Sequence, residues 1–540
     1  MALANPEGEW QESRCTFGSV AGVIALGTFS KFPRAPRVRV DAGLPAAASL
    51  LGRARRSILG ALVIAFMLAG CAVGPNFQPP EAPDTAGYLS RSGKADAVPG
   101  QALARRAAIP ARWWELFHSR HLNMMIEEGI AHNADVDAAK AALRVAQANA
   151  LAQRGALLPL VTGEFNPTRQ KVATQALTSN AVDSSNIYNL HTAQVTVTFV
   201  PDVWGGLRRQ AESAEALAEA QGYQYEGVYL SLTANIALAA IQEASLRGQI
   251  AATQRLIDIQ TQLLEILRRQ NRAGQIALPD VVAQETAVAQ ARLLLPPLER
   301  QLAQQRNLLA VLTGRFPSDG MAATFQLGSF RLPRRLPLSV PADLVRQRPD
   351  IRVAESNLHS ADAQIGVAIA NRLPQLTLSA SNGSAANAIS RLFSPDTGFW
   401  TLAANVTQPI LDGWILENKQ RAAEAFRAQA AAQYRGTVLV AFQNVADTLR
   451  ALQADARMLD AAIAAERSAS QSIQLVSRQV EQGQVSLPAL LNAQQAYLQT
   501  SLARVQAEAA RLADTVALFQ ALGGGWWNRP DVVKPERMPQ

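Results

Sequence analysis

DVDAAKAALRVAQANALAQRGALLP, residues 135–159, is followed 215 residues later by DIRVAESNLHSADAQIGVAIANRLP, residues 350–374, and the two stretches align without a gap. They share Asp, Ala, Leu and Pro at matching positions. Further landmarks keep the same order in both halves: PDVWG at 201–205 and PILDG at 409–413, GQIALP at 274–279 and GQVSLP at 483–488, and Gly314 and Gly523. A conserved order over so long a stretch predicts a duplicated domain rather than a solenoid of short repeats.

Each repeat is predicted to begin with a helix, at about residues 121–156 and 342–371, which a Pro ends. Two segments follow in which apolar residues alternate with polar ones, and this period of two predicts strands. A polar loop, at about 167–190 or 382–398, separates the two segments. In the first repeat the alternating positions are Val161, Gly163 and Phe165 in one segment and Val195, Val197 and Phe199 in the other. In the second repeat they are Leu376, Leu378 and Ala380, and the partner segment spans about 400–411.

After its second strand each repeat contains a long stretch without Pro, at about 206–271 and 414–481. At 1.5 Å per residue, a helix of about 65 residues is roughly 100 Å long and must pack beside similar helices. Return helices are predicted at about 280–313 and 488–522, the first with a kink or a break at Leu295 before Pro296-Pro297. A coiled-coil seam is predicted from apolar spacings of four and three at Val438, Phe442, Val445, Leu449, Leu452, Ala456, Leu459 and Ile463.

The four predicted strands cannot close a barrel, and an open sheet edge cannot lie in lipid. Their length of about 9–11 residues suits a tilted strand that crosses a membrane. Two alternatives therefore remain from the residues alone. Either the strands form small soluble hairpins, or several chains pool their strands, in which case three chains would supply twelve.

Composition excludes several classes of protein. Of the 540 residues 48% are hydrophobic, which is too many for a disordered chain, and two Cys cannot hold so long a chain together as a disulfide scaffold. The sequence has no clean apolar run of about 20 residues, which argues against a polytopic helical membrane protein. The net charge is +8, of which +4 falls in residues 1–70, and no basic stripe predicts a nucleic-acid partner.

The N-terminal region is predicted to be an address. Arg53, Arg55 and Arg56 precede a short apolar stretch at 58–68, which ends in Leu68-Ala69-Gly70-Cys71. The end of this stretch resembles the lipobox of bacterial lipoproteins, which implies a signal peptide at 51–70 and an acylated Cys71 as the mature N-terminus. Ala72 in place of an Asp implies the outer membrane. Residues 1–50 are an N-terminal extension in this interpretation, and the alternative is a chance apolar helix with a buried Cys.

Together these features resemble one family. The chain is similar to the TolC-type outer-membrane factors, in their lipoprotein (NodT-like) branch, which serve RND-type tripartite efflux pumps. The resemblance covers nearly all of residues 58–530. It rests on the order of the landmarks, the duplication and five signatures: CAVGPNF at 71–77, WW at 113–114, RPDI at 348–351, QPILDG at 408–413 and ALGGGW at 521–526.

The resemblance implies a mainly α fold with a small β part, in which a homotrimer shares a twelve-stranded barrel, four strands from each chain, above a long periplasmic coiled-coil tunnel. The two repeats would be 119–314 and 342–522, and the segments 71–118, 315–341 and 523–540 would surround the tunnel midway. The implied partners are outer-membrane lipid, a periplasmic adaptor and an inner-membrane RND-type transporter. No cofactor is implied beyond the diacylglyceryl and N-acyl groups on Cys71.

The implied function is passive exit of small molecules, such as drugs or toxic compounds, from the periplasm. Two alternatives remain. One is the exit duct of a protein-secretion system. The other is a lipid-anchored periplasmic coiled-coil scaffold without a pore, which the four strands at matched positions disfavour.

The predicted entrance lies at the turns between the long and return helices. In the family this turn carries G-x-x-x-L-x-D-V, and nearby acids line the constriction. The matching residues here are Gly274, Leu278, Asp280 and Val281 in the first repeat, and Gly483 and Leu487 in the second. Ala489 replaces the second acid, and Asn492 and Gln495 replace a family Asp and Arg.

We therefore expect a single acidic ring of Asp280, with Asn492 as a polar neighbour, that favours cations and a basic adaptor tip. The alternative is that Asp280 only caps the return helix after Pro279. Arg268, Arg269 and Arg272 precede the turn. They are interpreted as a solvated face rather than as partners for a neighbouring chain.

Catalytic signatures are weak. The five His are His118, His121, His132, His191 and His359, and no carboxylate or Cys cluster completes a metal ligand set around them. No phosphate-binding loop or nucleophile elbow stands out, so no enzymatic activity is predicted. Trp113-Trp114 is interpreted as packing of the N-terminal segment against the tunnel rather than as a binding platform.

Overall fold

The computed structural model divides into two compact units, Met1–Phe66 and Met67–Gln540. It describes residues 72–85, 87–89, 100–105, 107–171, 187–320, 323–482 and 484–530, all in the second unit. The predicted extension at 1–50, the signal peptide at 51–70, and the single residues Cys71 and Gly483 lie outside the described residues.

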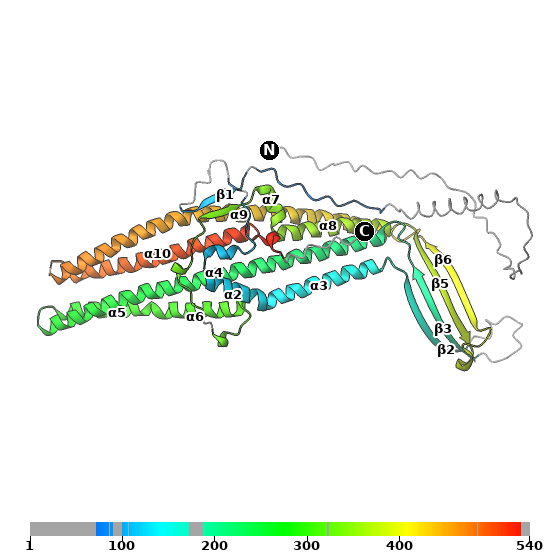
Figure 1. Cartoon of the computed structure of the whole chain (residues 1–540), viewed down its shortest axis with the longest axis horizontal. Helices are drawn as coiled ribbons and strands as arrows, with labels where there is room; N and C mark the ends of the chain where they lie inside the picture. Colours follow the sequence, from blue (N-terminus) through cyan, green and yellow to red (C-terminus); the bar gives the residue numbers. More distant parts are fainter. Residues whose placement is uncertain are drawn as a thin grey trace, which may run out of the picture. The chain divides into compact units, whose positions relative to one another are not determined.

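Helices dominate the described part of the chain (Figure 1). Two of them, α4 and α9, have 67 residues each and run from the sheet to the opposite end of the helical region. In the part of the chain that the structure describes, no helix is long and apolar enough to cross a bilayer. The α-helices are α2 (Arg120–His132), α3 (Ala134–Gly155), α4 (Gly206–Arg272), α5 (Leu278–Leu293), α6 (Leu295–Leu312), α7 (Pro341–Gln347), α8 (Pro349–Ala370), α9 (Ile415–Glu481) and α10 (Leu487–Ala521).

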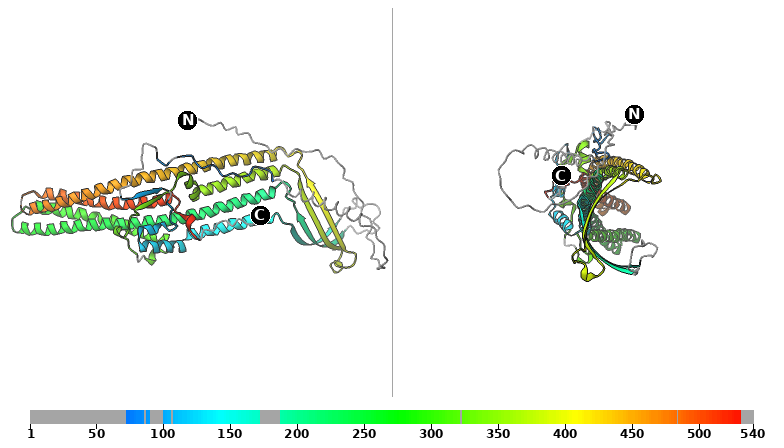
Figure 2. Two further views of the ribbon diagram at one scale, coloured as in Figure 1. Left: turned by 45° about the horizontal axis from the view of Figure 1, so that its top comes forward. Right: turned by 90° about the vertical axis from the view of Figure 1, so that its right-hand side faces the viewer.

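Four strands form one antiparallel sheet at one end of the helices, in the order β2-β3-β5-β6. The end-on view in Figure 2 shows that this sheet is curved. Its strands are β2 (Leu160–Lys171), β3 (Ile187–Phe199), β5 (Gln375–Ala386) and β6 (Gly398–Thr407). The predicted pair of strands in each repeat is therefore confirmed, and the two pairs join through β3 and β5.

The duplication is visible in the bounds of the elements. Helices α3 and α8 have 22 residues each and strands β2 and β5 have 12 each, at the predicted offset of 215. The predicted match of PDVWG with PILDG is wrong by one residue. The left-handed residue directly before the long helix is Gly205 in the first repeat but Trp414, not Gly413, in the second.

The two repeats lie side by side, and their helices form two sections that differ in packing, one near the sheet and one farther from it. Near the sheet, α3, α4, α8 and α9 pack in that order, each against the next. Farther from the sheet, α5 and α6 pack on α4, which packs on α10, which packs on α9. The long helices α4 and α9 run through both sections. The short helices that precede the sheet pack on the half of α4 and α9 near the sheet, and the return helices pack on the other half (Figure 2).

Three expectations about helix boundaries need correction. The first helix of each repeat is two helices, because Asn133 and Arg348 have extended backbone. The Asn133 side chain caps α3 by accepting hydrogen bonds from the backbone amides of Asp135 and Val136. Arg348 precedes a proline, which disfavours helical backbone. The return helix breaks at Leu294, between α5 and α6, one residue before the predicted position.

The predicted loops are too long and the predicted strands too few. Strand β2 continues to Lys171, β3 begins at Ile187 and β5 continues to Ala386, so polar residues interpreted as loop belong to the sheet. Two further short strands, β1 (Ala102–Arg105) and β4 (Arg335–Leu338), pair in parallel away from the sheet. They join two of the segments predicted to surround the tunnel, although neither has an alternating sequence.

The main core lies where these connecting segments meet the helices. Trp113 and Trp114, in the 3-10 turn η1 (Trp113–Phe117), are almost fully buried. The ring of Trp113 stacks on Phe519 of α10, with centroids 5.3 Å apart and planes inclined by 17°. This confirms the packing interpretation of the Trp pair. Of the predicted seam, Val438 to Leu459 is buried or packed against the core, whereas Ile463 is 39% exposed.

Candidate functional site

The register of the sheet gives it one apolar and one polar face. Val161, Val197, Ala380 and Leu402 lie directly opposite one another in a row across β2, β3, β5 and β6. The next row consists of Thr162, Thr196, Ser381 and Thr401. Residues that pair across antiparallel strands lie on the same face, and neighbours along a strand lie on opposite faces. The alternation read from the sequence therefore places all the apolar positions on one face.

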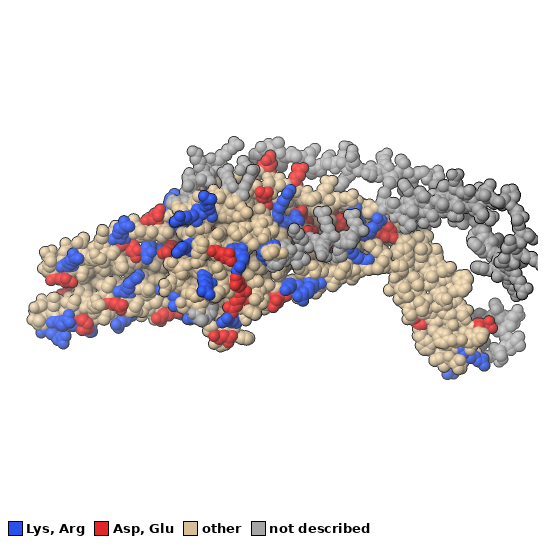
Figure 3. Space-filling view, viewed as in Figure 1, with Lys and Arg blue, Asp and Glu red and all other residues tan. Residues whose placement is uncertain are grey.

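Charged residues are scarce in this sheet. Within the four strands they are Glu164, Arg169 and Lys171, all in β2. Figure 3 shows that the displayed face of the sheet is nearly free of charge except near its far end, whereas the helices carry both signs. Glu164 lies on the polar face and accepts a hydrogen bond of 3.0 Å from Gln194, its cross-strand partner. One face can thus contact an apolar medium while the other contacts water.

The sheet ends in two edges, β2 and β6, which have no partner strand within the described residues. Both edges are long, with 12 and 10 residues, and both display large apolar side chains. In β6 the side chains of Trp400, Leu402 and Val406 are 66–73% exposed. Soluble proteins shorten, charge or cover such edges, because exposed edges aggregate. These edges indicate that further strands pair with them.

The predicted entrance motif forms the turn between α4 and α5. Gly274 has a left-handed backbone with φ of +74°, a conformation that favours glycine. The amide of Gln275 donates a 2.9 Å hydrogen bond to the carbonyl of Gln270, which closes the end of α4. Val281 is 5% exposed, in a small apolar cluster that includes Leu487 of α10. Motif residues Gly274, Val281 and Leu487 therefore have structural roles at the turn.

The two predicted gate residues lie on different helical hairpins. Asp280 is in the first turn of α5, where Ala277 is the N-cap residue, and Asn492 is an exposed residue of α10. Among the described residues no hydrogen bond joins their two side chains. Leu278, beside Asp280 in the motif, is 62% exposed and forms part of the outer surface of the turn.

Arg268 forms ion pairs within its own chain. Its guanidinium lies 2.8 Å from Glu285 of α5 and 2.9 Å from Glu265 of α4. All three side chains are well exposed, so these pairs add little stability. Within one chain this arginine lies on an exposed face and links the two helices of the hairpin.

Sequence analysis did not identify a buried glutamine cluster above the turns. Gln260 of α4 donates a 3.1 Å hydrogen bond to Gln494 of α10, and Gln284 of α5 donates one of 3.0 Å to the carbonyl of Gln260. All three side chains are buried. They join the hairpins of the two repeats with polar contacts, and isolated glutamines in helical sequence gave no signal of this.

The residues that follow Cys71 are also fixed in place. Val73 donates a 3.0 Å backbone hydrogen bond to Trp204, and Arg209 of α4 contacts the same segment. In the sequence the predicted lipid attachment site directly precedes this described, hydrogen-bonded segment. Of the five histidines, His359 lies beside this segment and pairs with Glu212. Within the described residues no group of three or more His, Cys, Asp or Glu could hold a metal ion.

Comparison with known proteins follows the same division into repeats. The sequence matches the family described as outer membrane efflux protein over residues 125–315 and 340–524, one segment for each repeat. Together the two segments cover more than half of the chain.

Curated relatives match over most of their length. The pyoverdine export outer membrane protein OpmQ of Pseudomonas putida is 29% identical over 445 residues, which cover 82% of this chain and 92% of that protein. The toluene efflux pump outer membrane protein TtgC of Pseudomonas putida is 28% identical over 476 residues, covering 88% and 96%. Nodulation protein T of Rhizobium leguminosarum bv. trifolii is 28% identical over 468 residues, covering 85% and 96%.

Solved structures have the same fold. The outer-membrane channel OprN superposes with a TM-score of 0.77 at 26% identity, covering 84% of this chain and all of that one. The Campylobacter jejuni CmeC outer membrane channel superposes with a TM-score of 0.78 at 21% identity, covering 86% and 97%. The fold predicted from the sequence is therefore confirmed by the repeats, by the sheet and by these likenesses.

Proposed function

Since the chain belongs to the outer membrane efflux protein family, we propose that three copies of it pool their sheets into one twelve-stranded barrel and conduct small molecules out of the periplasm. As a member of this family it is an outer-membrane exit duct for efflux, with a large periplasmic part, as the resemblance implied. The number of chains, their partners and the compounds that they carry belong to the proposal.

The observation that supports the proposal is the two-faced sheet with two open edges. An open edge leaves backbone amides and carbonyls without partners, which lipid cannot satisfy. Closure with β2 of one copy beside β6 of the next would satisfy both edges. The row from Val161 to Leu402 would then face lipid, and the row from Thr162 to Thr401 would face a water-filled lumen.

The partners follow from where the helices lead. A passive duct needs a source of energy, which an inner-membrane RND-type transporter would supply. A periplasmic adaptor would connect that transporter to the helical turns. The relatives are named for toluene efflux and pyoverdine export, which supports small organic molecules as the class of cargo. We propose that cargo passes the turns at a constriction formed by Asp280 and Asn492.

The lipid anchor is part of the same proposal. Cys71 would carry diacylglyceryl and N-acyl groups, and it would be the only Cys after removal of residues 1–70. Acyl chains gain about 0.8 kcal/mol for each buried CH₂, and stable attachment takes more than one chain. The anchor and the barrel would hold the trimer in the outer membrane together.

The test is conductance and mass of the acylated full chain, purified in detergent. Native mass spectrometry should give three times the mature chain mass plus lipid, and planar bilayers should show discrete conductance steps. A monomer without conductance would overturn the proposal. A trimer that remains silent, even after deletion of residues 270–284 and 479–493 at the turns, would instead support a scaffold without a pore.

A further inference from the structure

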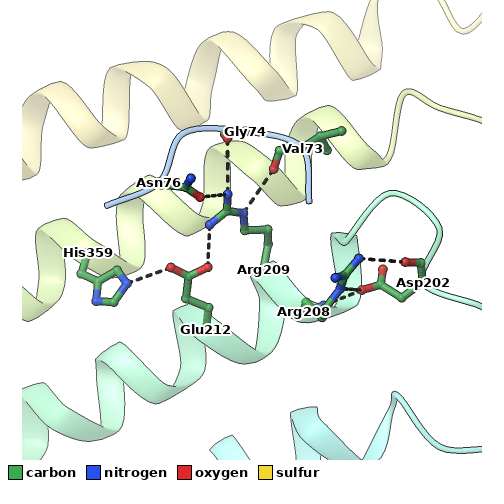
Figure 4. Close-up of polar contacts among 8 residues, drawn as sticks. All are labelled: Val73, Gly74, Asn76, Asp202, Arg208, Arg209, Glu212 and His359. Carbon is green, nitrogen blue, oxygen red and sulfur yellow. Dashed lines mark hydrogen bonds and ion pairs between the residues drawn. The ribbon is translucent and has the colours of Figure 1, made fainter. Parts of the chain in front are cut away.

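One buried arginine gathers the chain just after Cys71. Arg209, in the first turn of α4, donates from Nε to the carbonyl of Val73 at 3.2 Å (Figure 4). Its Nη2 donates to the carbonyl of Gly74 at 3.3 Å and to Oδ1 of Asn76 at 2.7 Å. Its Nη1 donates to Glu212 at 2.8 Å. Almost the whole planar fork of the guanidinium is used, and its charge is compensated.

A second layer holds Glu212 and the end of the segment. His359 of α8 has Nε2 at 2.9 Å from Glu212 Oε1, and the ring of Phe77 stacks on His359 with centroids 4.3 Å apart. Burial raises the pKa of Glu212, but the hydrogen bonds from His359 and Arg209 outweigh it and leave the pKa below its ordinary value. The carboxylate is therefore charged at neutral pH and supports the arginine.

The backbone of the segment lies very close to α8. Gly74 has a φ of +94°, and a Cβ added there would lie 2.5 Å from the Cα of Gly366 in α8. A Cβ on Gly366 would lie 2.8 Å from the carbonyl oxygen of Val73. Contacts under 3 Å cannot be accommodated without movement of backbone, so glycine is needed at both positions. The segment is thus recognised by shape as well as by charge.

The segment lies where the helices meet the sheet. Val73 donates a backbone hydrogen bond to Trp204, which precedes α4, and the Trp204 indole donates a 2.7 Å hydrogen bond to the carbonyl of Pro374, which precedes β5. Residues 72–77 are therefore connected to the start of the long helix in one repeat and the start of a strand in the other.

We propose that Arg209, Glu212 and His359 form a clamp that fixes the N-terminal segment 72–77 and so sets the height at which the lipid anchor leaves the protein. Ala72 lies against Gly205 at the junction between helices and sheet, and an anchor on the preceding residue would join the chain one Cα–Cα step of about 3.8 Å from it. The acyl chains would then enter the leaflet at the base of the barrel. This consequence for the anchor rests on the proposed function, whereas the clamp itself does not.

The test compares Arg209→Gln with Arg421→Gln in the acylated full chain. Arg421 lies near the start of α9, in the other repeat, and its exposed side chain pairs with Glu417 of the same helix at 2.6 Å. Hydrogen–deuterium exchange is measured on the acylated N-terminal peptide 71–80, in which the label on the Val73 amide is retained, with a peptide from the middle of α4 as the internal standard. Exchange of the Val73 amide, which donates to the carbonyl of Trp204, should rise about ten- to a hundredfold in Arg209→Gln and remain unchanged in Arg421→Gln.

Gly74→Val provides a second variant that disturbs the clamp from the side of the segment, should Arg209→Gln fail to fold. It should raise exchange of the same peptide and leave α4 unchanged. Equal exchange in wild type, Arg209→Gln and Gly74→Val would overturn the clamp. The intact mass of the mature chain tests the anchor separately from the clamp. A mature chain without acyl groups would overturn the role in anchoring and the proposed lipid site, whereas the hydrogen–deuterium exchange result would still decide whether the clamp exists.

Discussion

Arg529 and Glu226 form a buried ion pair between the C-terminal segment and α4. Nη2 of Arg529 lies 3.0 Å from Oε1 of Glu226, and the two side chains are only 4% and 7% exposed. The guanidinium also lies over the ring of Tyr229, 3.9 Å from its centroid. A buried charge is costly unless it is paired, so this contact fixes where the chain after α10 returns to the first repeat.

Replacement of Arg529 by Met should destabilise the protein by about 3–5 kcal/mol, because the Glu226 carboxylate stays buried without this guanidinium. The double variant Arg529→Met, Glu226→Leu should recover most of the loss, since apolar pairs often replace a buried ion pair at little cost. Denaturant unfolding of purified protein measures both. If the single variant is as stable as wild type, the pair does not hold the segment.

The two faces of the sheet predict opposite tolerance to charge. Leu402 and Thr401 are neighbours in β6, on the apolar and polar rows respectively. Leu402→Lys should lower the stability of the membrane-inserted trimer by about 2–4 kcal/mol, because the charge would face hydrocarbon. Thr401→Lys should be tolerated, since its side chain would face the lumen. Folding into lipid vesicles, followed by resistance to heat and protease, compares the two.

Equal loss in both Lys variants would mean that neither face is wetted, and it would contradict the assignment of lumen and lipid. If Thr401→Lys lost more stability than Leu402→Lys, the assignment of the lipid face and the lumen face would be reversed.

Long-range periodicity made most of the fold predictable. Alternation in the strands and the seam from Val438 to Leu459 each repeat a local rule many times, so single exceptions do not hide them. Boundaries were less predictable, because one capping residue decides them. Asn133 divides a helical stretch that has no Pro or Gly at that point, and only its backbone and side-chain hydrogen bonds show why.

The sites illustrate the same limit. The spacing of the motif predicts the turn at Gly274, because the left-handed backbone that favours glycine there depends only on neighbouring residues. The clamp has no local signal: Arg209 contacts Asn76 across 133 positions, and Glu212 contacts His359 across 147. His359 was recognised only as a residue without a metal ligand set. Such contacts become visible only when the packing of α4 on α8 is known.

Two carboxyl groups lie together between α9 and α10. Burial, together with the hydrogen bond and the charge of Asp455, raises the pKa of Asp514 to about 7. The folded protein therefore holds a proton that the unfolded chain releases above about pH 4. Stability from this site is present at low pH and is lost as pH rises towards 7.

Asp514→Asn should remove this loss and make the variant more stable than wild type at pH 8 but not at pH 4. The slope of unfolding free energy against pH should change by at most about 1.4 kcal/mol per unit, and by less because water screens the half-buried pair. Unfolding midpoints at several pH values measure the slope. Asp460→Asn, which changes an exposed carboxylate of α9, is the control and should leave it unaltered. Parallel profiles for wild type and Asp514→Asn would contradict the shared proton.

Asp280 provides the last prediction, because it separates a gate from a helix cap. In a trimer the three carboxylates would form a ring at the entrance, and Asp280→Asn should reduce the preference for cations, seen as a shift of the reversal potential towards zero in a salt gradient. A residue that only stabilises the first turn of α5 would contribute about 0.3–1 kcal/mol through the helix dipole and leave the reversal potential unchanged.

The matched control is Asp319→Asn, in the segment between the repeats, which removes the same charge far from the turns. It should not alter selectivity. Asn492→Asp should act in the opposite direction to Asp280→Asn and increase the preference for cations, if both side chains line one constriction. An unchanged reversal potential in Asp280→Asn and Asn492→Asp alike would remove both residues from the conduction path, and the constriction would then lie elsewhere along the helices.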